Sequence, residues 1–537
     1  MPKNEIDDYF YARRDITCLS SLLAALEHWK FTGPELDYRP RPRLMSEADQ
    51  RRMFYTALAD VSSTVDRSVA VTGSLAADQK VRLVVSISKS VIDEFAATQS
   101  HTSSASESTL FGAAMDVDKE DKASWPKASR SEPLSIDHLL LSLLESKLES
   151  ALPLLERTLK HHPTEFLQRI VASDAIFPRH HKGFRGIFKR WKADKLLDKY
   201  LLPEGGITKV IGKAQAESIE KRIPGVRVGN TGRVIVSKGN LVKWINGMGS
   251  LLCETVKTLK DGNQSCEVQT SMGMECLAII SIIREVFSAD EFMPVFVASS
   301  LAPVLASCYT QSQSIDVNDS AAHQSYPIPI CLHTLVINYL NYVCSYRGSA
   351  SVLYVNHRCY AHMLPEFKLE VHYLTTDDST LEMRDISLDK VLRSLIAVDT
   401  TERWYKRRRG WLRAQKVAGS IHPEAALICL QLATTTQGQV DRLQAQHNFG
   451  DDAAQLLSQL DNCVGLSRKM CWCCNRLWNF KVGNWKGSTD PQYCHGHVLP
   501  WIPPAYGVSL KALEHMRMDL IEILRETIVS LKAEDST

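Results

Sequence analysis

The feature that most constrains this chain is a cluster of three cysteines. Cys471, Cys473 and Cys474 stand in the stretch DNCVGLSRKMCWCCNRLWNF (461–480), whereas most of the fourteen cysteines are scattered singly. The pattern predicts a short strand over 463–466, a small loop, and an apolar helix that begins near Cys471. Cys471 and Cys474 are three positions apart, so their sulfurs point to one side of the first helical turn, whereas Cys473 faces elsewhere. A helix N-terminus favours thiolates, so the pair is a candidate for metal binding.

A histidine and a glutamate earlier in the chain can complete such a site. The stretch IHPEAALICL (421–430) places His422 two positions before Glu424, at the head of an apolar run. Alone, this pair is equally well explained as the start of a core helix, since the chain has 17 histidines. With Cys471 and Cys474, however, His422 supplies one nitrogen and two sulfurs, a set that zinc accepts in tetrahedral geometry with one position left for water. Glu424 can then receive the proton of a metal-activated water without binding the metal.

These motifs resemble those of zinc deaminases, in which H-x-E and C-x-x-C surround the catalytic metal. The chain is most similar to the deaminase-like domain family that is common in fungal proteins and was first named from an Orientia sequence. The likeness spans about residues 350–520 and rests on three blocks in this order: IHPEAALICL, VGLSRKMCWCCNRLW and HGHVLPWIPP. The resemblance implies an α/β/α three-layer domain of the cytidine deaminase-like fold.

The resemblance also implies roles for individual residues. His422, Cys471 and Cys474 would bind Zn²⁺, and Glu424 would be the catalytic residue that moves protons between water and the leaving ammonia. The block HGHVLPWIPP would supply the next strand and a loop near the pocket. Residues near the pocket would then include Trp472, Trp501, His495 and His497, with Trp501 as a wall for a flat ring and the roles of the two histidines open.

The chain departs from the commoner deaminase pattern in two places. Met470 precedes the first cysteine, where that pattern has proline. A Gln-rich insertion at about 437–459 lengthens the path from the H-x-E motif to the cysteines, and it could cover or reshape the pocket. Substrates of ordinary cytidine deaminases are therefore a poor guide for this chain.

The same region permits a second metal site. Cys471, Cys474, Cys494 and His497 have the spacing of a closed structural zinc site, in which case the H-x-E stretch is only the start of a core helix. A zinc-stabilised protein that binds a ligand or another protein without turnover is the alternative function.

Composition and periodicity divide the rest of the chain. We predict a helical N-terminal region at 1–98, a Ser-rich and charged linker at 99–134, and a second helical region at 135–325. Residues 326–537 would form the zinc deaminase-like domain, in which SVLYVNH and EFKLEVHYL are typical of strands. The overall fold class is α+β, with a mainly α-helical N-terminal half.

Charge gives little information about partners. The formal net charge is +2, so any contact with nucleic acid must come from a local patch, such as the basic stretches at 179–200 and 402–413. We predict a nucleobase or nucleoside, or single-stranded nucleic acid, as the substrate. The sequence has no signal peptide and no run of about 18 apolar residues, which predicts an intracellular protein, cytoplasmic or nuclear, without membrane contact.

Overall fold

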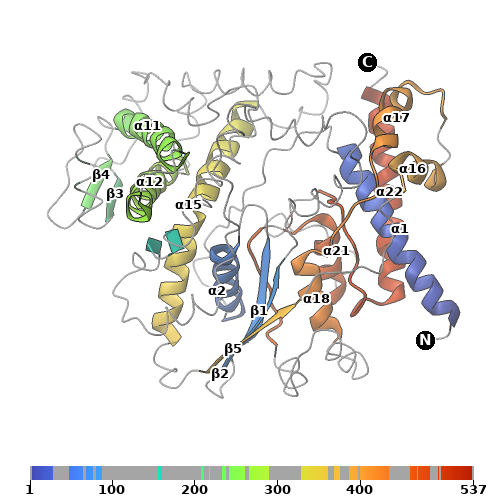
Figure 1. The fold of residues 1–537 in the computed structure, drawn as a ribbon, viewed down its shortest axis with the longest axis horizontal. Helices are drawn as coiled ribbons and strands as arrows, with labels where there is room; N and C mark the ends of the chain where they lie inside the picture. The colour runs from blue at the N-terminus through green and yellow to red at the C-terminus, as the bar shows by residue number, and fades with distance from the viewer. Residues whose placement is uncertain are drawn as a thin grey trace.

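The computed structural model of the chain is a helix-rich α+β fold built around a small sheet (Figure 1). Its helices are α1 (Lys3–Glu27), α2 (Glu47–Ser62), α11 (Leu241–Lys260), α12 (Cys266–Phe287), α15 (Ile328–Tyr360), α16 (Leu388–Leu395), α17 (Arg403–Ala414), α18 (Pro423–Ala433), α21 (Trp472–Lys481) and α22 (Leu510–Glu534). The residues described are 3–27, 47–63, 68–75, 80–87, 207–210, 233–236, 241–260, 265–288, 328–360, 368–374, 386–396, 399–433, 460–468, 470–483, 494 and 497–534, together with 155, 156, 158, 159, 217 and 220.

The central sheet combines segments that are far apart in the chain. Its strands, in order across the sheet, are β5 (Lys368–Leu374), β2 (Lys80–Ile87), β1 (Val69–Leu75) and β6 (Gly465–Leu466). β1 runs antiparallel to both of its neighbours, whereas β2 and β5 are parallel. A separate antiparallel pair joins β3 (Ile207–Val210) to β4 (Arg233–Val236).

Helices cover both faces of the central sheet (Figure 1). α2 packs against β1 and β6 on one face, with α15 behind it, where Ser349 donates a hydrogen bond of 2.7 Å to Asp60. α18 lies on the opposite face, and α21 packs beside it. Side chains alternate along a strand, so Val71 faces α2, whereas Ala70 and Val84 join the core under α18. The sheet is therefore the middle of three layers.

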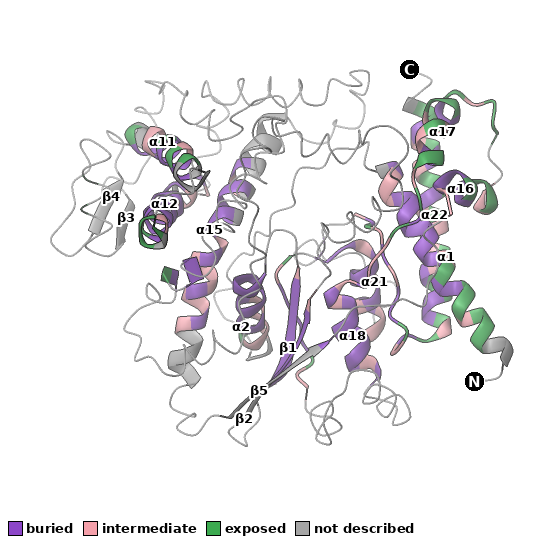
Figure 2. Ribbon diagram, viewed as in Figure 1, coloured by how far each residue is buried: buried purple, intermediate pink, exposed green. Residues whose placement is uncertain are grey.

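A further pair of helices closes the α18 side of the molecule. α1 packs along α22 although the two helices come from opposite ends of the sequence, and Arg517 pairs with Asp15 at 2.7 Å. Figure 2 shows buried residues along the faces that these helices turn inward. In this core, α1, α18, α21 and α22 meet around the fully buried side chain of Trp501.

Several elements agree with the predictions from sequence. The strand in EFKLEVHYL is confirmed as β5, the strand before the cysteine cluster as β6, and the helices at the H-x-E and C-x-x-C motifs as α18 and α21. Two helices, α16 and α17, follow β5 before the H-x-E motif. Three segments singled out in the sequence, at 99–134, 179–200 and 437–459, lie outside the described residues.

Two predictions of local structure are wrong. Residues 80–87 form a strand rather than a helix, because residues 83–86 are buried on both faces and the apolar residues of the stretch give no clear period. SVLYVNH (351–357) belongs to the long helix α15 rather than to a strand, since packing against α2 and α12 overrides the β preference of its branched residues. The predicted all-helical region at 1–98 thus contributes β1 and β2 to the sheet that also contains β5 and β6. The other predicted boundaries stay predictions.

The described helices include none with the length and apolar character needed to cross a membrane.

The close contact between β6 and α2 gives a test of the sheet. A methyl group at Gly465 would overlap the backbone of Tyr55 and Thr56, so Gly465→Ala should lower the free energy of unfolding by about 1–3 kcal/mol. Gly410→Ala is the control, because a methyl group at that position in α17 meets nothing within 4 Å and should stabilise the helix by about 0.5–1 kcal/mol. Thermal or denaturant unfolding measures both values. Equal stability of Gly465→Ala and the wild type would mean that β6 does not press against α2.

Candidate metal centre

Two helix N-termini bring three candidate metal ligands together. α18 begins at Pro423, so His422 lies immediately before its first turn, and the following residues, Ala425 to Leu430, are all buried. A helix that is apolar on all sides must lie inside the protein, which fixes its N-terminus in the core. Cys471 is the N-cap of α21, and Cys474 lies in the first turn of that helix.

The three ligand atoms form a nearly equilateral triangle. The sulfur of Cys471 lies 3.5 Å from the sulfur of Cys474, and His422 Nδ1 lies 3.4 Å and 3.5 Å from these two sulfurs respectively. Tetrahedral zinc, with Zn–S of about 2.3 Å and Zn–N of about 2.0–2.1 Å, would separate two sulfurs by about 3.8 Å and a sulfur from a nitrogen by about 3.6 Å. The triangle therefore has the dimensions of one face of a tetrahedral site, and the group could hold a metal ion.

Backbone groups orient these ligands. The carbonyl of Pro500 lies 3.2 Å from His422 Nε2, where it can accept a hydrogen bond only if Nε2 carries the proton. In the neutral imidazole that a metal requires, this tautomer leaves a lone pair on Nδ1, the nitrogen that faces the two sulfurs. The N–H of Cys474 points at the sulfur of Cys471 from 3.5 Å, and the N-terminus of α21 favours negative charge there.

Glu424 lies next to the triangle without being part of it. Its Oε1 is 3.8 Å from His422 Nδ1, and it is not among the three residues whose ligand atoms all lie within 4.8 Å of one another. The side chains of His422 and Glu424 keep 15% and 12% of their surface exposed, so water can reach a mostly enclosed site. The position suits a carboxylate that exchanges protons with a water held at the triangle.

Burial and charge set the protonation of the site. Burial raises the pKa of Cys471, but hydrogen bonds from Cys473 and Cys474 and the positive charge of His422 together hold the pKa of Cys471 well below its usual value. Burial lowers the pKa of His422, but the charge of Cys471, a hydrogen bond to it and the charge of Glu424 raise that pKa to about 9. Burial is also the main cause of the raised pKa values of Cys474 and Glu424. These shifts favour a thiolate at Cys471, an imidazolium at His422 and a protonated thiol at Cys474.

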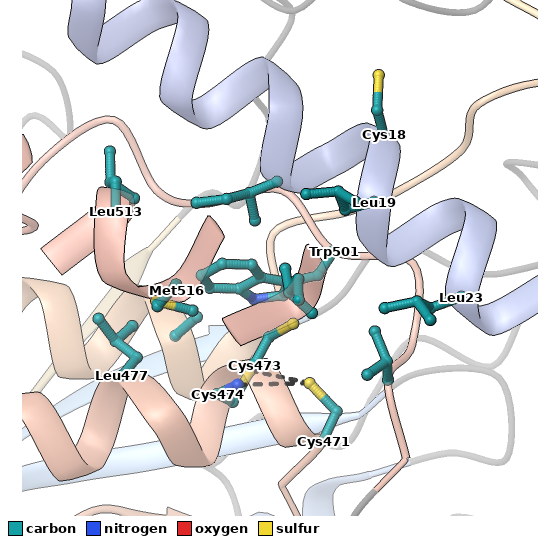
Figure 3. Close-up of a cluster of buried hydrophobic side chains, with 14 of the residues drawn as sticks. Cys18, Leu19, Leu23, Cys471, Cys473, Cys474, Leu477, Trp501, Leu513 and Met516 are labelled. Atoms are coloured by element: carbon teal, nitrogen blue, oxygen red, sulfur yellow. Dashed lines mark hydrogen bonds between the residues drawn. The ribbon is translucent and has the colours of Figure 1, made fainter. Parts of the chain in front are cut away.

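The third cysteine of the cluster belongs to the core beneath the site. Figure 3 shows the sulfurs of Cys471 and Cys474 facing each other, whereas Cys473 extends toward Trp501. Cys473 and Trp501 are both fully buried. Cys473 is therefore not one of the three grouped ligands, although its side chain lies close enough to hydrogen-bond the sulfur of Cys471.

The predicted pocket residues have different surroundings. Trp501 is fully buried among Leu19, Leu23 and Met516, so its ring lies in the core and is not an exposed wall for a flat ligand (Figure 3). The expectation for Trp501 is corrected accordingly. Trp472 is half-buried, and His495 lies outside the described residues.

The alternative closed site is not formed by the described side chains. Cys494 and His497 are both described, yet only His422 joins Cys471 and Cys474 within ligand distance. The backbone carbonyl of His497 instead accepts a hydrogen bond of 2.8 Å from the N–H of Trp472. His497 therefore supports the N-terminus of α21 through its backbone.

The basic stretch at 402–413 forms α17, whose aromatic residues face inward. Trp404 is buried, and Arg408 donates a hydrogen bond of 3.4 Å to its carbonyl. Arg409 lies over the ring of Tyr405, 5.9 Å from its centre. Binding of phosphates by this helix remains a prediction.

Sequence reasoning missed two contacts around the site. One is the hydrogen bond between His422 and the carbonyl of Pro500, and the other is the contact of Trp501 with Ser20 on α1, at the opposite end of the sequence. A single carbonyl acceptor has no side-chain signature, and a contact across most of the chain leaves no local pattern. Only the HGHVLPWIPP block, quoted for the resemblance, pointed to Pro500 as part of the site's neighbourhood.

Comparison of the chain with protein-family models, with curated proteins and with solved structures finds no match.

Proposed function

We propose that this chain is a zinc-dependent hydrolytic deaminase that acts on a nucleobase, a nucleoside or a base in single-stranded nucleic acid. The observation that carries the proposal is the triangle of His422, Cys471 and Cys474 with the carboxylate of Glu424 beside it. The three-layer arrangement around the sheet supports a domain of the cytidine deaminase-like fold, which the three sequence blocks also imply.

Zinc is the metal that this ligand set fits best. Two thiolates and one imidazole suit Zn²⁺, which prefers sulfur and nitrogen ligands in a tetrahedral arrangement, whereas Mg²⁺ and Ca²⁺ prefer oxygen. Three protein ligands leave the fourth position for water, as in catalytic rather than structural sites. When bound, zinc would lower the pKa of that water and so make it a nucleophile near neutral pH.

The chain's own residues would handle the protons. Glu424 would carry the two protons of the attacking water, one to the ring nitrogen beside the reacting carbon and one to the amino nitrogen, which leaves as ammonia. The reaction consumes water, replaces an exocyclic C–NH₂ group by C=O and needs no oxidant. Burial keeps the pKa of Glu424 raised, which brings it closer to neutral pH and suits a group that both takes and gives a proton.

The alternative function is a zinc-stabilised protein without turnover. The closed Cys471/Cys474/Cys494/His497 site would favour it, but the described positions of Cys494 and His497 give it no support. The exposed fraction of Glu424 also favours a site that solutes reach.

Zinc binding should release protons, because the ligands must be deprotonated. His422, with its pKa raised to about 9, holds a proton at pH 7, as does Cys474 with its raised pKa, whereas the lowered pKa of Cys471 favours its thiolate form. We therefore expect about two protons to leave per zinc ion at pH 7 and about one above pH 9, where Cys474 still holds its proton, so zinc affinity should rise with pH across this whole range. Calorimetric titration in buffers of different ionisation enthalpy measures the proton count. A count near zero would contradict the assigned protonation.

The direct test of the proposed function is ammonia release. Zinc-loaded protein is incubated with free bases, nucleosides and single-stranded oligonucleotides that contain cytosine or adenine, and ammonia and the deaminated product are measured. Chelator-treated protein is the control. Stoichiometric zinc without turnover of any of these three substrate classes would favour the non-catalytic alternative.

A further inference from the structure

The segment Pro500–Pro504 connects His422 to the N-terminal helix. The carbonyl of Pro500 is the hydrogen-bond partner of His422 Nε2. Prolines at three of the five positions leave only Trp501 and Ile502 with a backbone N–H. The segment therefore has few hydrogen bonds of its own with which to fix that carbonyl.

Residues on one side of α1 form hydrogen bonds with the Pro500–Pro504 segment. Arg13 is four positions after Tyr9 and seven positions before Ser20, so the three residues line one side of the helix. Ser20 Oγ accepts a hydrogen bond of 3.0 Å from the N–H of Trp501, and it lies 3.1 Å from the carbonyl of the same residue. Arg13 donates to the carbonyl of Pro503 from Nε at 3.0 Å and from a terminal nitrogen at 2.7 Å.

The same helix also holds the backbone just before His422. Ser21 and Ala418 exchange hydrogen bonds, with Ser21 Oγ donating to the carbonyl and the N–H of Ala418 donating to Oγ at 3.3 Å. Ser420 accepts a hydrogen bond of 3.0 Å from the N–H of Ile502. α1 thus contacts both segments that determine where the imidazole lies.

The α1 residues that make these contacts lie in the protein interior. Arg13 keeps 1% and Ser20 0% of its surface exposed. Burying a guanidinium is costly unless its donors are used, and here two of them converge on one carbonyl. A helix that needed only to cover the core could do so with apolar residues at these positions.

We propose that α1 positions the metal site: Ser20 and Arg13 fix the Pro500–Pro504 segment, and its Pro500 carbonyl sets the tautomer and orientation of His422. This inference rests on the proposed function, because it assumes that His422 binds zinc. Ser20 and Arg13 are positioning residues, since neither contacts the ligand triangle.

The test measures zinc affinity and ligand geometry in full-length variants. Ser20→Ala removes the hydroxyl, Ser20→Thr restores it, and Arg13→Lys keeps the charge but loses the paired donation to Pro503. Ser281→Ala is the matched control. Ser281 is a buried helical serine that donates a hydrogen bond of 2.8 Å to a carbonyl of its own helix, α12. Zinc dissociation constants are measured by competition with a chelator, and visible absorption of the Co²⁺-substituted proteins reports the ligand geometry.

We expect Ser20→Ala and Arg13→Lys to weaken zinc binding about 10–100-fold and to shift the Co²⁺ bands, as is typical when partners of a metal ligand are lost. Ser20→Thr should return toward the wild type, and Ser281→Ala should match it. Arg13→Lys decides the matter if Ser20→Ala does not fold. Wild-type affinity and Co²⁺ spectra in a folded Ser20→Ala or Arg13→Lys protein would overturn the inference. A wild-type protein that binds no zinc would instead overturn the proposed metal site itself.

Discussion

Glu424→Gln should abolish ammonia release and leave zinc bound. Glutamine has the size and shape of glutamate, so it can keep the packing in the first turn of α18, but it cannot accept the proton of the attacking water. Loss of a general acid–base group typically lowers kcat by about 10²–10⁴-fold. Metal content and ammonia release are measured on the same preparation, with whichever substrate the wild type turns over.

Glu267→Gln is the control for this substitution. Glu267 also lies in the first turn of a helix, α12, but is exposed and outside the ligand group. Its variant should retain both zinc and turnover. If Glu424→Gln releases ammonia at the wild-type rate, Glu424 is not the proton carrier and the mechanism proposed above is wrong.

Zinc content should fall from about one ion per chain to almost none in His422→Ala and in Cys474→Ala. Each substitution leaves two protein ligands, which is fewer than the three or four that hold zinc in proteins. Turnover should disappear with the metal. Metal analysis after dialysis against a weak chelator, together with circular dichroism to check folding, measures the effect.

Cys494→Ala separates the two possible ligand sets. Cys494 is buried like Cys474 but is not within ligand distance of the triangle, so its variant should keep zinc. The opposite pattern, in which Cys494→Ala loses zinc and His422→Ala keeps it, would show that the closed structural site forms instead.

The ligand triangle could be predicted from sequence because each part depends on local rules. Pro423 and the apolar run after it indicate a helix N-terminus, and the three-residue spacing of Cys471 and Cys474 places both sulfurs on one side of a turn. Neither motif, however, indicates how close the two lie to each other in the folded chain. The resemblance to a deaminase family supplied the expectation that His422 meets the cysteines, and the geometry agrees with it.

The sheet and the supports of the site could not be predicted in the same way. β1 and β2 are valine-rich and buried on both faces, so periodicity does not distinguish them from buried helix. Their partner β6 has only two residues, and it is positioned by Gly465 against α2 rather than by its own pattern. The contacts of Ser20 with Trp501 join opposite ends of the chain, and only the folded backbone brings them together.

The most direct test of the central claim is X-ray absorption at the zinc edge of the wild-type protein. The account predicts two sulfur ligands at about 2.3 Å, with one imidazole nitrogen and one water oxygen at about 2.0–2.1 Å. Glu424→Gln should give the same spectrum, since the carboxylate is not a ligand. Three sulfurs and one nitrogen around the metal would contradict the account, because a third cysteine, such as Cys494, would then occupy the open position that the proposed reaction needs.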